Sequence, residues 1–155
     1  MIRVLLALLL TVALAGVAFQ AIERGRIDRT ATRLDAAADR LARAASLLVA
    51  RDDPTASGVP GARRVVRLDL PERSLAAAPV ASFAVNGSDG APEAGGWIRY
   101  RVAGARPTRV RVPVDLRTPD GPLVYAGGGR RRFVLRLVAD GGPTVVVERG
   151  RPAEA

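Results

Sequence analysis

The chain has 155 residues, a formal net charge of +9, and no cysteine or histidine. The printed sequence contains no lysine either, so all 24 basic residues are arginine. These absences exclude disulfides, thiolate metal sites, histidine general bases and Schiff-base lysines. We therefore expect a non-enzyme made of one domain plus an anchor, with no cofactor, no metal and no small-molecule substrate.

Residues 1–22 form the first element, a transmembrane anchor or a signal segment. The apolar run is long enough to cross about 30 Å of hydrocarbon. It is interrupted only by Arg3, Thr11, Gly16 and Gln20. Small residues at positions 13–18 also suit a signal-peptide cleavage site. The helical pattern resumes directly after the run, which favours an uncleaved anchor.

The flanking charges bear on the orientation of this anchor. A cluster of arginines follows the apolar run, and a strict positive-inside count would place the next domain in the cytoplasm. An apolar run that begins at residue 4 instead resembles a secretion signal. We expect a single-pass protein of the cell membrane, with its β domain outside the cytoplasm.

Residues 23–53 are predicted to continue as an amphipathic helix. Its apolar residues follow a heptad spacing in which alanine alternates with a larger aliphatic residue. This packing seam consists of Ile27, Ala31, Leu34, Ala38, Leu41, Ala45 and Leu48. The seam needs a partner, either the chain's own sheet or a helix of another protein. Pro54 ends the helix, and residues 54–61 read as a linker.

Residues 62–149 change to a period of two, which indicates strands. Alternation is seen at 65–70, 81–85, 98–102, 110–116, 133–137 and 145–147, with a weaker segment at 123–126. Asn86-Gly87 is a turn signal, and residues 72–78 are expected to add a helical turn. We predict an antiparallel meander of six or seven strands, covered by the long helix in an α+β fold. Residues 150–155 form a tail.

Arginines on the polar side of the strands, together with those that follow the glycines at 127–129, form a candidate basic contact face. Its members are Arg99, Arg101, Arg109, Arg111, Arg130, Arg131, Arg132 and Arg136. The outward members Arg99, Arg101, Arg109, Arg111, Arg132 and Arg136 form one stripe if their strands are neighbours. The three glycines at 127–129 are predicted to form a flexible hairpin loop, because no lysine and no helix follow as in a phosphate loop. Only Trp97 is available on this face for base stacking, which disfavours nucleic acid.

The layout resembles type IV pilins and the pseudopilins of type II secretion, in which one helix lies half in the membrane and half on an antiparallel sheet. The opening MIRVLLALLLTVALAGVAF is also similar to an uncharacterised haloarchaeal family of small membrane proteins, a domain of unknown function. The resemblance implies an archaeal envelope protein that works with pilus or secretion machinery.

Two functions follow as hypotheses. The first is a minor pilin-like or assembly component that acts through contacts with other envelope, pilus or secretion proteins. The second is a secreted or surface-tethered basic module that binds an anionic ligand, namely a polymer, a lipid headgroup or DNA.

Overall fold

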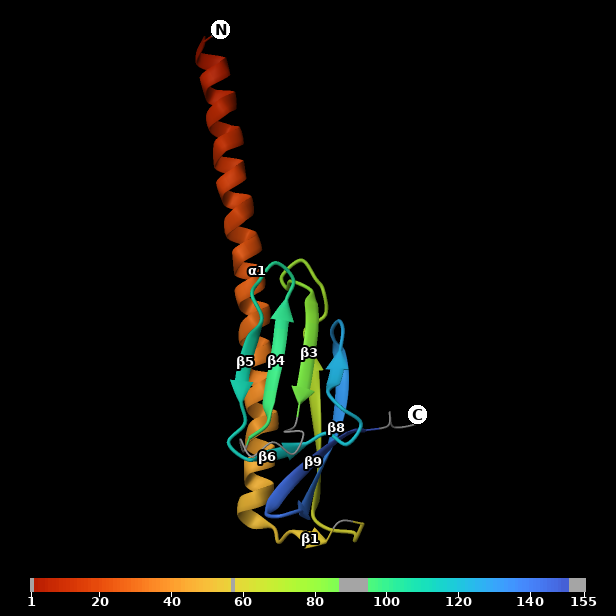
Figure 1. Ribbon diagram of the computed structural model, residues 1–155. Coiled ribbons are helices and arrows are strands. Elements are labelled where there is room, and N and C mark those ends of the chain that lie inside the picture. The colour runs from red at the N-terminus through yellow and green to blue at the C-terminus, as the bar shows by residue number, and fades with distance from the viewer. Residues whose placement is uncertain (1, 57, 87–94, 151–155) are drawn as a thin grey trace, which may run out of the picture.

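A computed structural model describes residues 2–56, 58–86 and 95–150. These residues form one long helix and nine strands (Figure 1). The elements are α1 (Ile2–Arg51), β1 (Thr55–Ala56), β2 (Arg63–Leu70), β3 (Val80–Asn86), β4 (Trp97–Val102), β5 (Thr108–Arg111), β6 (Asp115–Arg117), β7 (Leu123–Tyr125), β8 (Gly129–Ala139) and β9 (Pro143–Arg149). The predicted turn after Asn86 and the tail beyond Gly150 lie outside the described residues.

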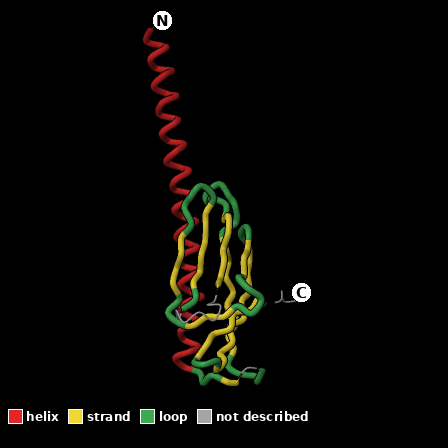
Figure 2. Tube along the Cα trace, viewed as in Figure 1, coloured by secondary structure: helices red, strands yellow, loops and turns green. Residues whose placement is uncertain are grey.

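Helix α1 is unbroken, but its two halves have different surroundings. The first half projects beyond the β domain (Figure 2). Its large apolar side chains are exposed. By length and composition it is apolar enough to cross a membrane. The second half lies along the domain. The last backbone bond of the helix joins the Asp52 amide to the Leu48 carbonyl at 3.1 Å. Pro54 follows, so the predicted end of the helix is confirmed.

The strands form two sheets, so the prediction of one antiparallel meander is wrong although the α+β class is confirmed. In the larger sheet, β8 pairs antiparallel with β2 and β9 and parallel with β1, and β6 pairs parallel with β9. The smaller sheet runs β5-β4-β3-β7 and is antiparallel throughout. The strands β1 and β6 have two and three residues, too few for alternation to reveal their pairing.

The predicted strand at 110–116 is divided between the two sheets. Strand β5 ends at Arg111 in the smaller sheet, and β6 begins at Asp115 in the larger one. Pro113 lies between them and has no backbone N–H to donate to a ladder. The Val112 amide donates to the Gly96 carbonyl at 2.9 Å just before the crossing. The regular alternation of apolar residues therefore continues across the point where one strand ends and the chain crosses to the other sheet.

The core lies where the inner faces of both sheets meet α1. The rings of Phe83 in β3 and Phe133 in β8 have centroids 6.5 Å apart, and Tyr125 of β7 packs edge-on to Phe133 at 5.4 Å. Helix α1 lies against β2 and also touches β4, β8 and β9. The helix thus covers the side of the domain where the two sheets come together, and all three layers share one apolar cluster.

The connection between β2 and β3 is a bent loop, and the helical turn predicted there is absent from residues 72–78. Its last residues are fixed to α1 instead. The Thr30 hydroxyl donates to the Ala78 carbonyl at 3.1 Å, and the Ala78 amide donates to the Arg26 carbonyl at 3.4 Å. These bonds take up the polar backbone groups that a helical turn would otherwise have paired internally.

Candidate functional site

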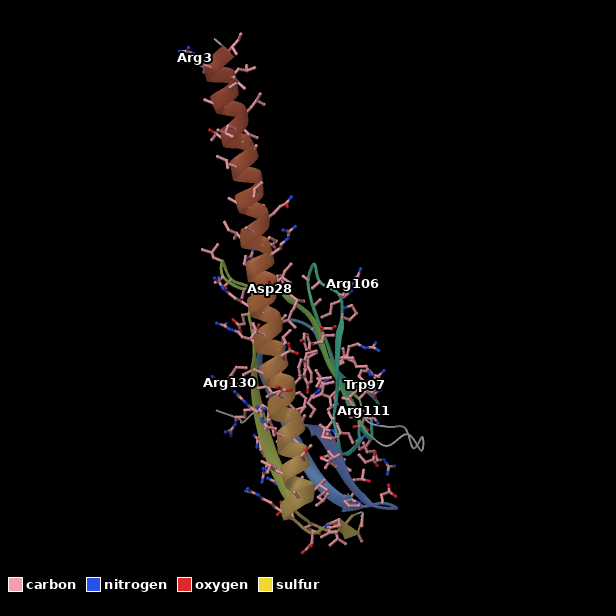
Figure 3. All side chains as sticks on the ribbon, turned by 90° about the vertical axis from the view of Figure 1, so that its left-hand side faces the viewer. Arg3, Asp28, Trp97, Arg106, Arg111 and Arg130 are labelled. Carbon is pink, nitrogen blue, oxygen red and sulfur yellow. The ribbon has the colours of Figure 1, made fainter. Side chains whose placement is uncertain are left out.

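The outer surface of the smaller sheet gathers a tryptophan and four arginines. On β4 the alternation buries Ile98, Tyr100 and Val102, and it turns the residues between them outward. The strand register then sets β5 beside them, with Trp97 opposite Arg111 and Arg99 opposite Arg109. We call this surface the Trp97 face; it consists of Trp97, Arg99, Arg101, Arg109 and Arg111. Figure 3 labels Trp97 and Arg111 on it.

Trp97 organises the two nearest arginines of this face. The guanidinium carbon of Arg99 lies 4.8 Å from the centroid of the Trp97 ring, and that of Arg109 lies 4.9 Å from it. Two like charges directly opposite each other on neighbouring strands destabilise a sheet. Stacking on indole offsets this repulsion, and it leaves the in-plane N–H donors of each guanidinium free of the ring. The arrangement presents hydrogen-bond donors for an oxyanion.

The Trp97 face has no acidic neighbour within its sheet. The sequences of β3, β4, β5 and β7 contain neither aspartate nor glutamate. Among the described residues, the ion pairs include none from Arg99, Arg101 or Arg109. The exposed positive charge of Arg99, Arg101 and Arg109 attracts anions and raises their local concentration. Chemically, the face can bind carboxylate, phosphate or sulfate groups.

The remaining predicted contact arginines lie in the other sheet, so the condition for a single stripe, neighbouring strands, is not met. Arg130, Arg132 and Arg136 belong to β8 in the larger sheet. Arg130 pairs with Asp69 at 3.2 Å and Arg136 with Glu148 at 3.4 Å. In Figure 3, Arg130 and Trp97 stand on opposite sides of the domain. The larger sheet therefore mixes both charges, unlike the Trp97 face.

Arg131 differs from its neighbours because it serves the packing of the domain. Its guanidinium lies 5.3 Å from the Tyr125 ring centroid and donates to the carbonyls of Gly128 at 2.9 Å and Ala126 at 3.3 Å. Strand alternation turns it to the same side as buried Phe133. Arg131, which the sequence assigned to a partner surface, therefore stabilises the connection between β7 and β8 by hydrogen bonds to its backbone.

The packing seam of α1 is covered by the chain's own sheets. Leu34, Ala38, Leu41, Ala45 and Leu48 are all buried, and Ile27 and Ala31 are partly buried against the same cluster. Of the two partners that the sequence left open, the structure places the intramolecular sheet on this face. Sequence reasoning missed Thr30 and Ala37, which are also buried, because an unbent helix repeats every 3.6 residues and drifts from the heptad.

Tyr100 links the smaller sheet to α1. Its hydroxyl donates a hydrogen bond to the Asp35 carboxylate, and its side chain is otherwise buried beneath the Trp97 face. Burial, and then the bond to Asp35, raise the pKa of Tyr100 to about 12. The neutral phenol is therefore the form that the folded state favours.

Replacing Tyr100 by phenylalanine is expected to make the free energy of unfolding depend less on pH in the alkaline range. With a folded-state pKa above the unfolded value, Tyr100 contributes stability that is present below about pH 10 and is lost toward pH 12. The chain has two tyrosines and neither cysteine nor lysine, so few other groups titrate there. Urea unfolding should show Tyr100→Phe to be about 1 kcal/mol less stable near pH 8. A pH dependence identical to that of the unaltered chain would contradict this role.

Among the described residues, no group of three or more aspartates and glutamates is placed to hold a metal ion.

The fold and the Trp97 face define a small α+β domain carried on an apolar helix. The family model described as Domain of unknown function (DUF7311) matches residues 1–150, and the chain belongs to this family. No curated protein and no solved structure matches the chain.

Proposed function

We propose that the protein is a non-enzymatic, single-span envelope protein whose β domain, outside the cytoplasm, binds an anionic polymer through the Trp97 face. One observation carries the proposal. Four arginines and one tryptophan share a sheet surface whose strands contain no acid. Cross-strand neighbours stand about 5 Å apart and successive outward residues about 7 Å apart. This spacing suits a ligand that repeats its negative charges.

The anchoring part of the proposal rests on α1. Its first half is exposed, apolar and long enough to span a bilayer. The domain is carried close to the membrane because α1 passes from one half to the other without a break. A tethered module of this kind would hold a surface polymer near the lipid, and the net charge of +9 would favour their encounter.

The test is retention of the full chain, in non-ionic detergent, on immobilised heparin as a polyanion probe. The double substitution Arg99→Gln and Arg109→Gln is expected to weaken retention. It should also lower the slope of log affinity against log salt by about two, since each lost contact releases about one counterion fewer.

The matched control is Arg130→Gln with Arg136→Gln, which removes the same charge from the larger sheet. Those arginines already face Asp69 and Glu148, so the salt slope should change little. Equal losses in the two double variants would mean that net charge alone drives retention, and the Trp97 face would be rejected as a site.

A second candidate is a minor pilin-like or assembly component of archaeal pilus or secretion machinery. The observation that favours it is the layout of α1, whose free half extends from a domain built on its other half (Figure 1). In an assembly, the free halves of many copies would pack together. Cross-linking through a cysteine at Leu10, in a chain with no other cysteine, separates helix–helix contact from contact with lipid.

A further inference from the structure

Leu75 is the most exposed large apolar residue of the β domain. It lies in the connection between β2 and β3 and is 97% exposed, against 55% for Val124 and 50% for Val59. Leaving a leucine side chain in water forgoes about 1.5–3 kcal/mol of burial. One exposed leucine alone needs no explanation, but the position of this one relative to α1 does.

The loop that carries Leu75 is held against α1 just beyond the apolar half. Arg26 donates to the carbonyls of Ser74 at 3.0 Å and Ala77 at 3.4 Å. Within the loop, the Ser74 amide donates to the Ala77 carbonyl at 3.1 Å. These bonds fix both ends of the segment that bears Leu75. The leucine is therefore presented at a defined height along the helix.

That height coincides with the surface of the bilayer in which α1 would lie. Arg26 comes four positions after Ile22, which is about 6 Å along a helix. The headgroup layer on each side of the hydrocarbon core is about 5–7 Å thick. The connection between β4 and β5 reaches the same end of the domain, because a Cβ on Gly104 would lie 3.3 Å from Ile27 (Figure 1).

Three exposed arginines lie at the same end of the domain as Leu75. Arg24 lies on α1, and Arg73 precedes Leu75 in its loop. Arg106, labelled in Figure 3, lies in the connection between β4 and β5. Two of the acidic residues near this end already have basic neighbours. Glu23 pairs with Arg26 at 2.8 Å, and Glu72 lines a hollow with Arg33 and Arg130 on the side of the domain. Asp28 remains exposed. Basic residues therefore exceed acidic residues at this end of the domain.

We propose that this end of the domain docks on the bilayer that holds α1. Leu75 inserts among the lipids, and Arg24, Arg73 and Arg106 contact anionic headgroups. The inference rests on the proposed insertion of α1 but not on polymer binding by the Trp97 face. Docking would fix the tilt of the domain against the membrane and direct the Trp97 face sideways, because that face lies along the length of the domain.

The test uses the full chain, reconstituted in vesicles of phosphatidylcholine and phosphatidylglycerol. Leu75→Cys supplies a unique thiol, since the chain has no cysteine, and it is labelled with an environment-sensitive dye. The emission is expected to shift to the blue and to be quenched by spin-labelled lipid. Adding Arg73→Gln and Arg106→Gln should reduce the effect of the anionic lipid.

The matched control is Val59→Cys, an exposed aliphatic position at the far end of the domain beyond the close of α1. Its dye should stay accessible to aqueous iodide and be quenched by spin-labelled lipid several-fold less. Flotation of the vesicles reports insertion of α1 independently. Equal water exposure of the two dyes on floating protein would overturn the docking while leaving the anchor intact; failure to float would overturn both.

Discussion

Replacing Leu41 by alanine is expected to lower the free energy of unfolding of the β domain by about 2–5 kcal/mol. Leu41 is 1% exposed and lies in the middle of the seam, where α1 meets the core shared by both sheets. Removing its side chain leaves a cavity among residues that the sheets hold in place. Leu41→Asp should be worse, because it also buries a carboxylate without a partner. Urea unfolding of the full chain in non-ionic detergent, followed by far-ultraviolet circular dichroism, measures both effects.

Leu47→Ala is the control on the same helix. Leu47 is 38% exposed, so its truncation should cost less than about 1 kcal/mol. Because helix propensity changes equally in the two variants, their difference reports packing alone. Similar small losses for Leu41→Ala and Leu47→Ala would contradict the contact between α1 and the sheets. The seam would then be exposed and available to bind another protein.

Helix α1 shows how much of this fold local sequence can predict. Its length follows from an uninterrupted helical pattern without proline, and its end follows from Pro54. The change from all-round apolar residues to a seam also marks where the helix leaves solvent or lipid and meets the core. These features depend on residues close in sequence, and the structure shows one helix that ends at Arg51, two residues before the predicted end at residue 53.

The arrangement of strands depends on pairings that local patterns do not encode. Alternation located most strands, but it carried no information about which strands are neighbours. The meander hypothesis failed where β6 pairs parallel with β9 and where β8 receives two partners on one edge. The break at Pro113 was the available signal that the segment at 110–116 is not one strand.

The Trp97 face could be predicted only in part, because its arrangement also depends on which strands are neighbours. Alternation placed Arg99, Arg101 and Arg109 outward, but only the register sets Arg99 opposite Arg109 with Trp97 beside both. Arg131 was assigned to a contact surface as part of the basic flank of the loop at 127–129, yet it stacks on Tyr125. Sequence patterns did not single out Leu75, because a single leucine in a loop has no periodicity. Its proposed role follows from its position along α1, which depends on the fold.

Gly128 gives the second large prediction, since the three glycines at 127–129 were expected to form a flexible hairpin loop. The structure instead packs Gly128 against the backbone that follows β2. A Cβ at this position would lie 2.3 Å from the Pro71 carbonyl oxygen and 2.7 Å from the Glu72 Cα. Backbone atoms cannot turn aside as the end of a side chain can, so Gly128→Ala is expected to cost about 3 kcal/mol or more. Thermal and urea unfolding of the full chain measure this loss.

Gly142→Ala separates this steric effect from the general consequences of replacing glycine. A Cβ on Gly142 would have no atom within 4 Å, so alanine there should be neutral or stabilise by a few tenths of a kcal/mol through the unfolded state. Relief of the clash at Gly128 would have to move the pairing of Leu70 with Gly129, where β2 meets β8. The unfolding defect should therefore come with faster amide hydrogen exchange at that end of β2. If Gly128→Ala is as stable as Gly142→Ala, the connection is the open loop that its composition predicts.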